Sequence, residues 1–135
     1  CPCGKRGCLE EYASTTALIA RAERQTGRTG LNGHMIFEGA SQGDPLLRLA
    51  LDGWLDDVAA GVTGLVHIFN PELVLIGGGV SAQEELLLKP LRARVLAGVM
   101  PRFAERLHIE RAVLGNNAGM IGAAKYFMDC EAERT

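Results

Sequence analysis

The sequence lacks a basic excess, a long apolar run and a leader in which basic residues precede an apolar stretch. Its formal net charge is −2 and its arginines are scattered, so the composition gives no support to a nucleic-acid surface, where basic residues cluster. A membrane span would need about 18 consecutive apolar residues, and no such stretch is present. These absences argue against a membrane segment and a signal peptide, and we therefore expect a cytoplasmic protein.

The chain also has no internal repeat and no low-complexity tract. Its 135 residues correspond to one domain, and 47% hydrophobic with 22% charged residues is ordinary for a globular protein. The first residue is Cys1 rather than methionine, and a motif begins there without a lead-in. We interpret the chain as a fragment or a processed product that lacks an N-terminal part.

The first third of the chain predicts two helices separated by a glycine-rich loop. Ser14 is a suitable N-cap, and apolar residues after it recur at helical spacing until Gly27. Residues 27–33 hold three glycines and are typical of a loop. A short helix is expected over residues 34–41.

The longest predicted helix has clear signals at both ends. Asp44 followed by Pro45 is a strong start, with aspartate as the N-cap and proline in the first turn. The helix should end at Asn70, because a residue that precedes proline disfavours helical backbone angles. Apolar residues recur every three or four positions and predict one buried face, made of Leu47, Leu51, Trp54, Val58, Val62, Leu65 and Phe69.

The second half of the chain predicts two strands and two helical segments. Residues 73–76 are fully apolar and indicate a buried, parallel-type strand, while residues 108–114 are a second strand candidate. Helical segments are expected over residues 82–98, with a break near Pro90, and after Asn117. This order indicates an α/β fold. Two short strands do not form a stable sheet alone, so the others must come from an absent N-terminal part or a second copy.

Three cysteines open the chain, at positions 1, 3 and 8. Thiolates separated by small residues can converge on Zn²⁺, which prefers four tetrahedral ligands, so Cys1, Cys3 and Cys8 are candidate metal ligands. Disulfides or free thiols remain an alternative, although an odd local count leaves one thiol over. The fourth ligand would have to come from another part of the chain, from water or from missing sequence; His34 lies after a flexible loop and could reach.

Three blocks of sequence resemble one known family. The run Cys-x-Cys-Gly-x-x-Gly-Cys-x-Glu at residues 1–10 continues as Glu-Tyr-Ala-Ser, residues 70–81 read Asn-Pro-Glu-Leu-Val-Leu-Ile-Gly-Gly-Gly-Val-Ser, and residues 115–124 read Gly-Asn-Asn-Ala-Gly-Met-Ile-Gly-Ala-Ala. Together they resemble the C-terminal part of the ROK family (repressor, open reading frame, kinase), which contains bacterial sugar kinases and sugar-responsive repressors.

The resemblance implies an actin-like, ribonuclease-H-like ATPase fold, of which this chain would be a helix-rich part with few strands. It implies that Cys1, Cys3 and Cys8 hold a structural zinc ion with an upstream histidine that has no counterpart here. It divides the chain into a zinc loop at residues 1–11 and an α/β body at residues 12–135.

The resemblance also assigns two binding roles. Glu10 would contact sugar hydroxyls, for which a carboxylate beside a rigid metal loop is a fixed acceptor. Without the resemblance, Glu10 is a solvent-facing carboxylate favoured by the helix dipole, the role that we keep for Glu11. Gly77, Gly78 and Gly79, between a strand and a helix, would line the adenosine side of an ATP site, although such a run can also be only a tight turn.

No catalytic residue is predicted in this chain. Phosphoryl transfer needs a phosphate-binding loop, Mg²⁺ and a base for the sugar hydroxyl, and neither the family's phosphate loop nor its catalytic aspartate is present in the sequence. We therefore expect an ATP-dependent sugar kinase of which this chain alone is inactive. The alternatives are the sugar-sensing domain of a repressor, which would bind nucleic acid through another segment, and a zinc-stabilised interaction module. The identity of the sugar cannot be read, and exposed apolar faces predict a homodimer.

Overall fold

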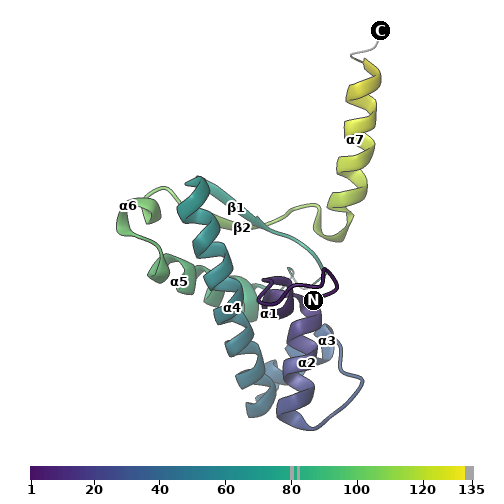
Figure 1. The fold of residues 1–135 in the computed structure, drawn as a ribbon, viewed down its shortest axis with the longest axis vertical. Coiled ribbons are helices and arrows are strands. Elements are labelled where there is room, and N and C mark those ends of the chain that lie inside the picture. The colour runs from purple at the N-terminus through teal and green to yellow at the C-terminus, as the bar shows by residue number, and fades with distance from the viewer. Residues whose placement is uncertain (80, 82, 133–135) are drawn as a thin grey trace.

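The computed structural model describes residues 1–79, 81 and 83–132. The predicted helix start at residue 82 and the last three residues of the predicted 12–135 body lie outside these described residues. The described chain is mainly helical, with one pair of strands, as predicted for an α/β piece with few strands. Figure 1 shows a packed group of helices at the N-terminal end, a short sheet above it and a last helix that stands apart.

The helical body is made of α1 (Glu10–Ala13), α2 (Thr15–Thr26), α3 (Gly33–Ser41) and α4 (Pro45–Phe69), with α1, α2 and α3 all packed against α4. The predicted caps are confirmed. The Ser14 side chain accepts from the Ala17 N–H at 3.1 Å, and the helix after it ends at Gly27 in the left-handed region. The short helix α1 was not predicted, because a single turn carries no apolar periodicity.

Helix α4 begins and ends where the sequence predicts. The Asp44 carboxylate accepts from the N–H groups of Leu46 and Leu47 at 3.0 and 3.2 Å, which satisfies donors that have no partner in the first turn. At the other end, Asn70 adopts the left-handed conformation, with φ of 45°, and its N–H closes on the Val66 carbonyl at 2.8 Å.

The core extends from the junction of α2, α3 and α4 to α5 (Lys89–Gly98) and one face of the sheet. Trp54 of α4 and Phe37 of α3 pack edge to face with ring centroids 6.4 Å apart, and both are buried beside Leu18 and Leu51. The indole N–H of Trp54 donates to the Ser14 carbonyl at 3.0 Å, so the aromatic core also fixes the junction between α1 and α2.

The prediction of a single buried face along α4 is wrong at the C-terminal end of the helix. Leu47, Leu51 and Trp54 are buried, but Leu65 and Phe69 are 49% and 71% exposed, while Val66 is buried. The body covers only the first turns of α4, and the last turns project beyond it toward the sheet (Figure 1). Periodicity correctly indicated a helix but did not show which residues another element covers.

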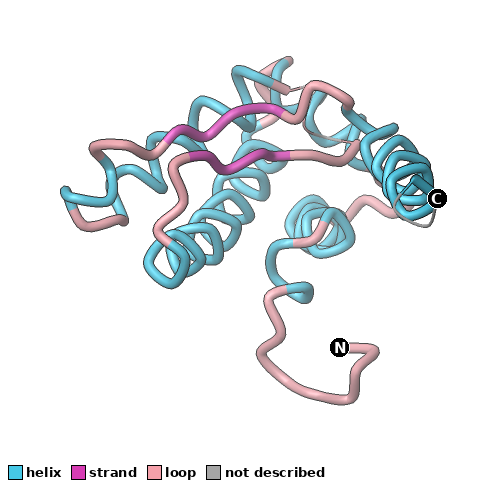
Figure 2. The backbone as a smooth tube through the Cα atoms, turned by 90° about the horizontal axis from the view of Figure 1, so that it is seen from above, coloured by secondary structure: helices cyan, strands magenta, loops and turns pink. Residues whose placement is uncertain are grey.

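The sheet pairs β1 (Leu73–Ile76) with β2 (His108–Arg111) in parallel, and Leu73 lies opposite His108. Figure 2 shows the two strands side by side. Between them run a π-helix (Glu84–Leu88), α5 (Lys89–Gly98) and α6 (Pro101–Ala104). The predicted break near Pro90 is confirmed as the change from π- to α-helix, with proline in the first turn of α5. The second strand is shorter than the predicted 108–114.

One face of the sheet is bare, which corrects the prediction of a fully buried strand. Val74 and Ile76 pack against the core, whereas Leu73 and Leu75 are 50% and 58% exposed. Parallel sheets are normally covered on both faces. Because the carbonyls of Glu72 and Ile76 accept bonds from β2, the alternate backbone groups of Leu73 and Leu75 face the outer edge, where no strand among the described residues pairs with them.

The last helix, α7 (Ala118–Ala132), follows a 3₁₀ turn (Gly115–Asn117) and extends away from the body (Figure 1). The predicted apolar stripe is present on it, but Ile121 and Met128 are exposed, together with Tyr126 and Phe127. An apolar helix of this length needs a packing partner to be stable in water. Among the described residues, no helix has both the length and the hydropathy needed to cross a membrane.

Candidate functional site

The cysteine loop is folded so that its three thiols converge. The sulfur atoms of Cys1, Cys3 and Cys8 all lie within 4.8 Å of one another, and those of Cys3 and Cys8 are 3.4 Å apart. Gly4 and Gly7 make this possible, because both have positive φ angles, of 78° and 74°, that side chains disfavour. The loop therefore turns twice within eight residues and brings the sulfurs to one side.

This arrangement fits a tetrahedral metal ion. With Zn–S bonds of about 2.3 Å, two thiolate ligands on one zinc lie about 3.8 Å apart, which is close to the spacing found here. All four cysteines of the chain are free thiols in the structure. No disulfide joins them here, and free thiols, the other half of the alternative that the sequence left open, match this state.

Without a cation, the loop favours the neutral thiol of Cys8. The pKa of Cys8 is raised above its ordinary value, first because its sulfur shares a hydrogen bond with Cys3, and then because of desolvation and the negative charge of Glu11. A bound zinc ion would reverse this preference, since it coordinates thiolates and releases their protons.

The structure does not bring a fourth ligand to the loop from the residues it describes. The sulfur cluster contains only the three cysteines, and His34 lies on α3, 80% exposed, with its Nδ1 atom 3.6 Å from a Glu38 carboxylate oxygen. His67 lies near the end of α4, where its Nε2 atom accepts from the Met100 N–H. The expectation that this chain holds only part of the ligand set remains a prediction.

Glu10 is held beside the cysteine loop as the first residue of α1. The adjacent Leu9 anchors this turn, because its side chain packs closely on Gly61 of α4. A Cβ atom added to Gly61 would lie only 2.9 Å from the Leu9 side chain. The Glu10 side chain is exposed and forms no hydrogen bond or ion pair within the described residues. Its carboxylate is thus available as an acceptor for a ligand.

A groove of about 270 Å³ runs from Glu10 along α2. Pro2 of the cysteine loop and Glu11 border it at one end, small side chains from Thr16 to Ala20 form its floor, and Arg24 lies at its far end. The arginines stand out in the sequence only as scattered charges, and Arg24 was not predicted to border a groove. The signal that could have revealed it is the spacing of four residues from Thr16 to Ala20 to Arg24, which puts these side chains on one helix face.

The glycine turn lies at the carboxyl end of β1. All three glycines are exposed, and Gly78 has a φ of 96°, a conformation that other residues disfavour. Ser81 closes the turn, because both its N–H and its hydroxyl donate to the Gly78 carbonyl, at 3.2 and 2.8 Å. A ligand could approach the backbone of Gly77 and Gly79 closely, since neither carries a side chain. Carboxyl ends of parallel strands are where α/β sheets bind ligands.

Together, the parallel strands joined through helices and the loop of three converging thiols define an α/β domain with a cysteine cluster at the start of the chain. The family model of the ROK family matches residues 1–129, and the chain belongs to the ROK family. This confirms the resemblance carried by the three sequence blocks.

Individual relatives are similar over nearly all of this chain but over less than half of their own length. A glucokinase of Thermotoga maritima is 37% identical, across 92% of this chain and 43% of that protein. The crystal structure of a ROK family glucokinase from Streptomyces griseus with glucose and AMPPNP is 32% identical, with a TM-score of 0.78, across 93% of this chain and 46% of that one. A ROK family transcriptional regulator, a homolog of the Escherichia coli MLC protein, is 25% identical, with a TM-score of 0.69 across 82% of this chain.

The structural likeness confirms the predicted fold class, since the solved neighbours are ROK sugar kinases with the actin-like ATPase fold. It also explains the bare sheet. The chain spans less than half of the matched structure, so only part of the fold is present here.

Proposed function

We propose that this chain is the sugar- and adenosine-contacting part of a longer protein, the parent protein, which is an ATP-dependent sugar kinase. The observation that carries the proposal is the free Glu10 carboxylate, fixed between the three-thiol loop and a groove. The similarity to a glucokinase solved with glucose and AMPPNP supports a hexose as acceptor and ATP as phosphate donor.

In this proposal, each part of the chain has a binding role. Glu10 accepts hydrogen bonds from sugar hydroxyls, which a charged acceptor holds more strongly than a neutral one. Gly77, Gly78 and Gly79 admit the adenosine side of ATP close to the backbone. The phosphate loop, the Mg²⁺ site and the catalytic base lie in the rest of the parent protein, and the isolated chain is inactive.

The decisive comparison is between two neighbouring glutamates in the parent protein. Glu10→Gln should lower kcat/KM for glucose about 10- to 100-fold, the loss expected when a charged hydrogen-bond acceptor is removed, while KM for ATP stays unchanged. Glu11→Gln, the matched control, should stay within about threefold of the parent. ADP release coupled to an optical readout measures both. Equal effects of the two changes would contradict the role of Glu10.

Zinc is the structural ion that we propose for Cys1, Cys3 and Cys8, with the fourth ligand supplied by the parent protein. Its chemistry there is to cross-link the loop and so to hold Glu10 in place. Elemental analysis should find about one zinc per parent protein, and Cys8→Ser should lose it while Cys130→Ser retains it. Retention of zinc by Cys8→Ser would refute the site.

The second candidate is the sugar-sensing domain of a repressor. It is favoured by the likeness to a ROK family transcriptional regulator. Both candidates use the same sugar site, so they are separated by whether the parent protein transfers the γ-phosphoryl group of ATP to a sugar hydroxyl and releases ADP. We favour the kinase, because the glycine turn keeps the exposed backbone that a nucleotide needs. A homodimer and a cytoplasmic location, where thiols stay reduced, complete the proposal.

A further inference from the structure

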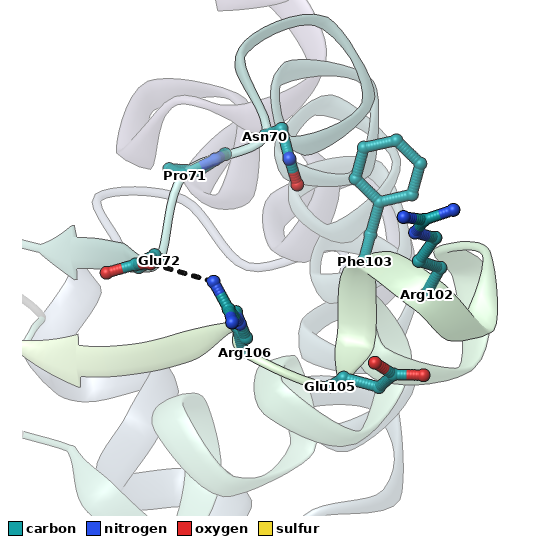
Figure 3. A pocket seen from close by; sticks show the side chains of 7 residues that line it. All are labelled: Asn70, Pro71, Glu72, Arg102, Phe103, Glu105 and Arg106. Atoms are coloured by element: carbon teal, nitrogen blue, oxygen red, sulfur yellow. Dashed lines mark ion pairs between the residues drawn. The ribbon is translucent and has the colours of Figure 1, made fainter.

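A cavity of about 560 Å³ lies at the amino-terminal edge of the sheet, where β1 and β2 begin (Figure 3). The glycine turn lies at the opposite, carboxyl end of β1, so this cavity is separate from the proposed ATP site. Its volume falls within the range of about 300–1,000 Å³ that is typical of small-molecule pockets. Neither the predicted strands nor the family resemblance predicted a cavity at this edge of the sheet.

The walls of the cavity are fixed by contacts between α4 and α6. The Phe103 ring packs edge to face on the His67 ring, with centroids 5.2 Å apart. The backbone N–H of Phe103 donates to the Met100 carbonyl at 2.9 Å. The Met100 N–H in turn donates to His67 Nε2 at 3.2 Å. Asn70 is held by its bond to Val66. A ligand would therefore meet a wall that is already formed.

The polar side chains around the cavity are largely unsatisfied. Arg102 and Glu105 form no ion pair or hydrogen bond within the described residues, and Arg106 reaches Glu72 only at 3.7 Å, with both side chains well exposed. Figure 3 shows Arg106 and Glu72 on one side, Arg102 and Phe103 on the other, and the Asn70 side chain between them. The lining thus presents guanidinium and carboxylate groups in equal number.

We propose that this cavity binds a small zwitterion, a ligand that carries one carboxylate or phosphate and one ammonium group. A purely anionic ligand would be attracted by Arg102 and Arg106 but repelled by Glu72 and Glu105. A ligand with both charges satisfies both sets, and the Phe103 ring gives its carbon skeleton an apolar contact. Free amino acids and amino sugar phosphates share this chemistry. Because the cavity lies apart from the proposed kinase site, its occupant is an effector rather than a substrate.

The test is calorimetric titration of the parent protein with four probes, in saturating glucose so that the proposed sugar site is already occupied. Glucosamine 6-phosphate and glutamine are the zwitterions, while glucose 6-phosphate and glucosamine each keep only one of the two charges. At least one zwitterion should bind about tenfold or more tightly than both single-charge probes. Which of the two zwitterions binds identifies the source of the ligand. Absence of binding by both, or equal binding of single-charge probes, would overturn the proposal.

Variants place the binding in this cavity. Arg102→Ala and Glu105→Gln should each weaken zwitterion binding about tenfold, and these changes of exposed side chains leave the fold intact. Arg48→Ala is the matched control, because Arg48, like Arg102, is an exposed arginine. It lies on a different part of the surface and forms only a long ion pair, 3.7 Å from Asp52. This variant should bind the zwitterion as tightly as the unsubstituted parent protein does. Binding that survives both cavity variants would rule out this cavity. Sugar kinase activity without the zwitterion is expected to be unchanged, so this proposal can fail while the kinase proposal stands.

Discussion

The two ends of this chain differ in whether their large apolar side chains are buried. In the helical body, Leu18, Leu51 and Trp54 are buried in one cluster, and α2, α3 and α4 each begin with a capping side chain. In the sheet and α7, residues of the same kind, such as Leu75 and Phe127, face solvent. One buried core joins the helical body to α5 and to one face of the sheet, whereas the described residues leave the other face of β1 and the apolar side chains of α7 uncovered.

The largest expected effect compares two leucines from these regions. Leu51 is 1% exposed and Leu75 is 58% exposed. Leu51→Ala should lower the free energy of unfolding by about 2–5 kcal/mol, because it leaves a cavity in a packed core. Leu75→Ala should change it by less than about 0.5 kcal/mol in the isolated chain, because solvent already contacts this side chain. Urea unfolding followed by tryptophan fluorescence measures both.

The same two substitutions can be examined in the parent protein, where the difference between their losses of unfolding free energy should be smaller. If the rest of the fold covers the bare face of β1, Leu75→Ala becomes a core substitution and costs about 2 kcal/mol or more there. An unchanged, small effect in the parent protein would show that Leu75 stays exposed, and the comparison between the two regions would then reflect a truly open sheet.

Local signals in the sequence predicted most of the helical body. Caps at Ser14 and Asp44, and the stop at Asn70, depend on groups within four residues of one another, so the sequence shows them directly. The convergence of Cys1, Cys3 and Cys8 was likewise predictable, because Gly4 and Gly7 allow an eight-residue loop to turn back on itself. The family resemblance supplied what spacing alone did not, namely the role proposed for Glu10.

Features that depend on distant contacts were not predictable. Periodicity placed Leu65 and Phe69 on the buried face of α4, but burial requires an opposing element, and none of the described residues supplies one there. The zwitterion cavity joins Glu72 to Arg102, residues brought together by the parallel pairing of β1 with β2 and by the contacts between α4 and α6. No motif spans such a separation, so only the folded chain reveals the cavity.

The second prediction concerns the exposed helix α7. In the isolated chain, its apolar side chains should drive self-association, since large exposed apolar patches pair with one another. Phe127→Lys should weaken this association about tenfold or more, as measured by sedimentation velocity over a range of concentrations. Gln42→Lys, which adds the same charge to the helical body without removing apolar surface, should associate as the original chain does. A chain that stays monomeric at all concentrations would remove the basis for the predicted homodimer.

A third prediction uses two arginines of α5 that link it to different regions. Arg94 bonds Asp56 and Asp52 of α4 at 2.7 and 3.1 Å, while Arg92 donates to the Ile109 carbonyl at the outer edge of β2 at 2.6 Å. Arg94→Ala should cost less than about 1 kcal/mol of unfolding free energy, as for other partly exposed ion pairs.

Arg92→Ala should cost somewhat more, about 1–2 kcal/mol, because it leaves a backbone carbonyl of a buried residue without its charged donor. It should also speed amide hydrogen exchange in β2 while leaving exchange in α4 unchanged. Similar exchange throughout the molecule in both variants would mean that the body and the sheet unfold as one unit, contrary to the comparison drawn above.

The smallest expected effect is a pH dependence confined to the helical body. The pKa of Asp44 is lowered below its ordinary value, first by the hydrogen bond from the Leu47 N–H and also by Arg28 and the Leu46 N–H. A carboxyl group with a lowered folded pKa stabilises the fold above its unfolded pKa of about 3.9, and this stabilisation is lost as the pH falls through the folded value. Asp44→Asn should therefore lower the Tm by a few degrees at pH 7 and by much less near pH 2.

Ser14 provides the control, because a hydroxyl cap does not titrate in this range. Ser14→Ala should lower the Tm by a similar amount at both pH values. If the deficit of Asp44→Asn were as large at pH 2 as at pH 7, the cap would act through hydrogen-bond geometry alone, and the charge on Asp44 would contribute nothing. If the deficit disappears in acid, the negative charge on Asp44 is what stabilises the start of α4.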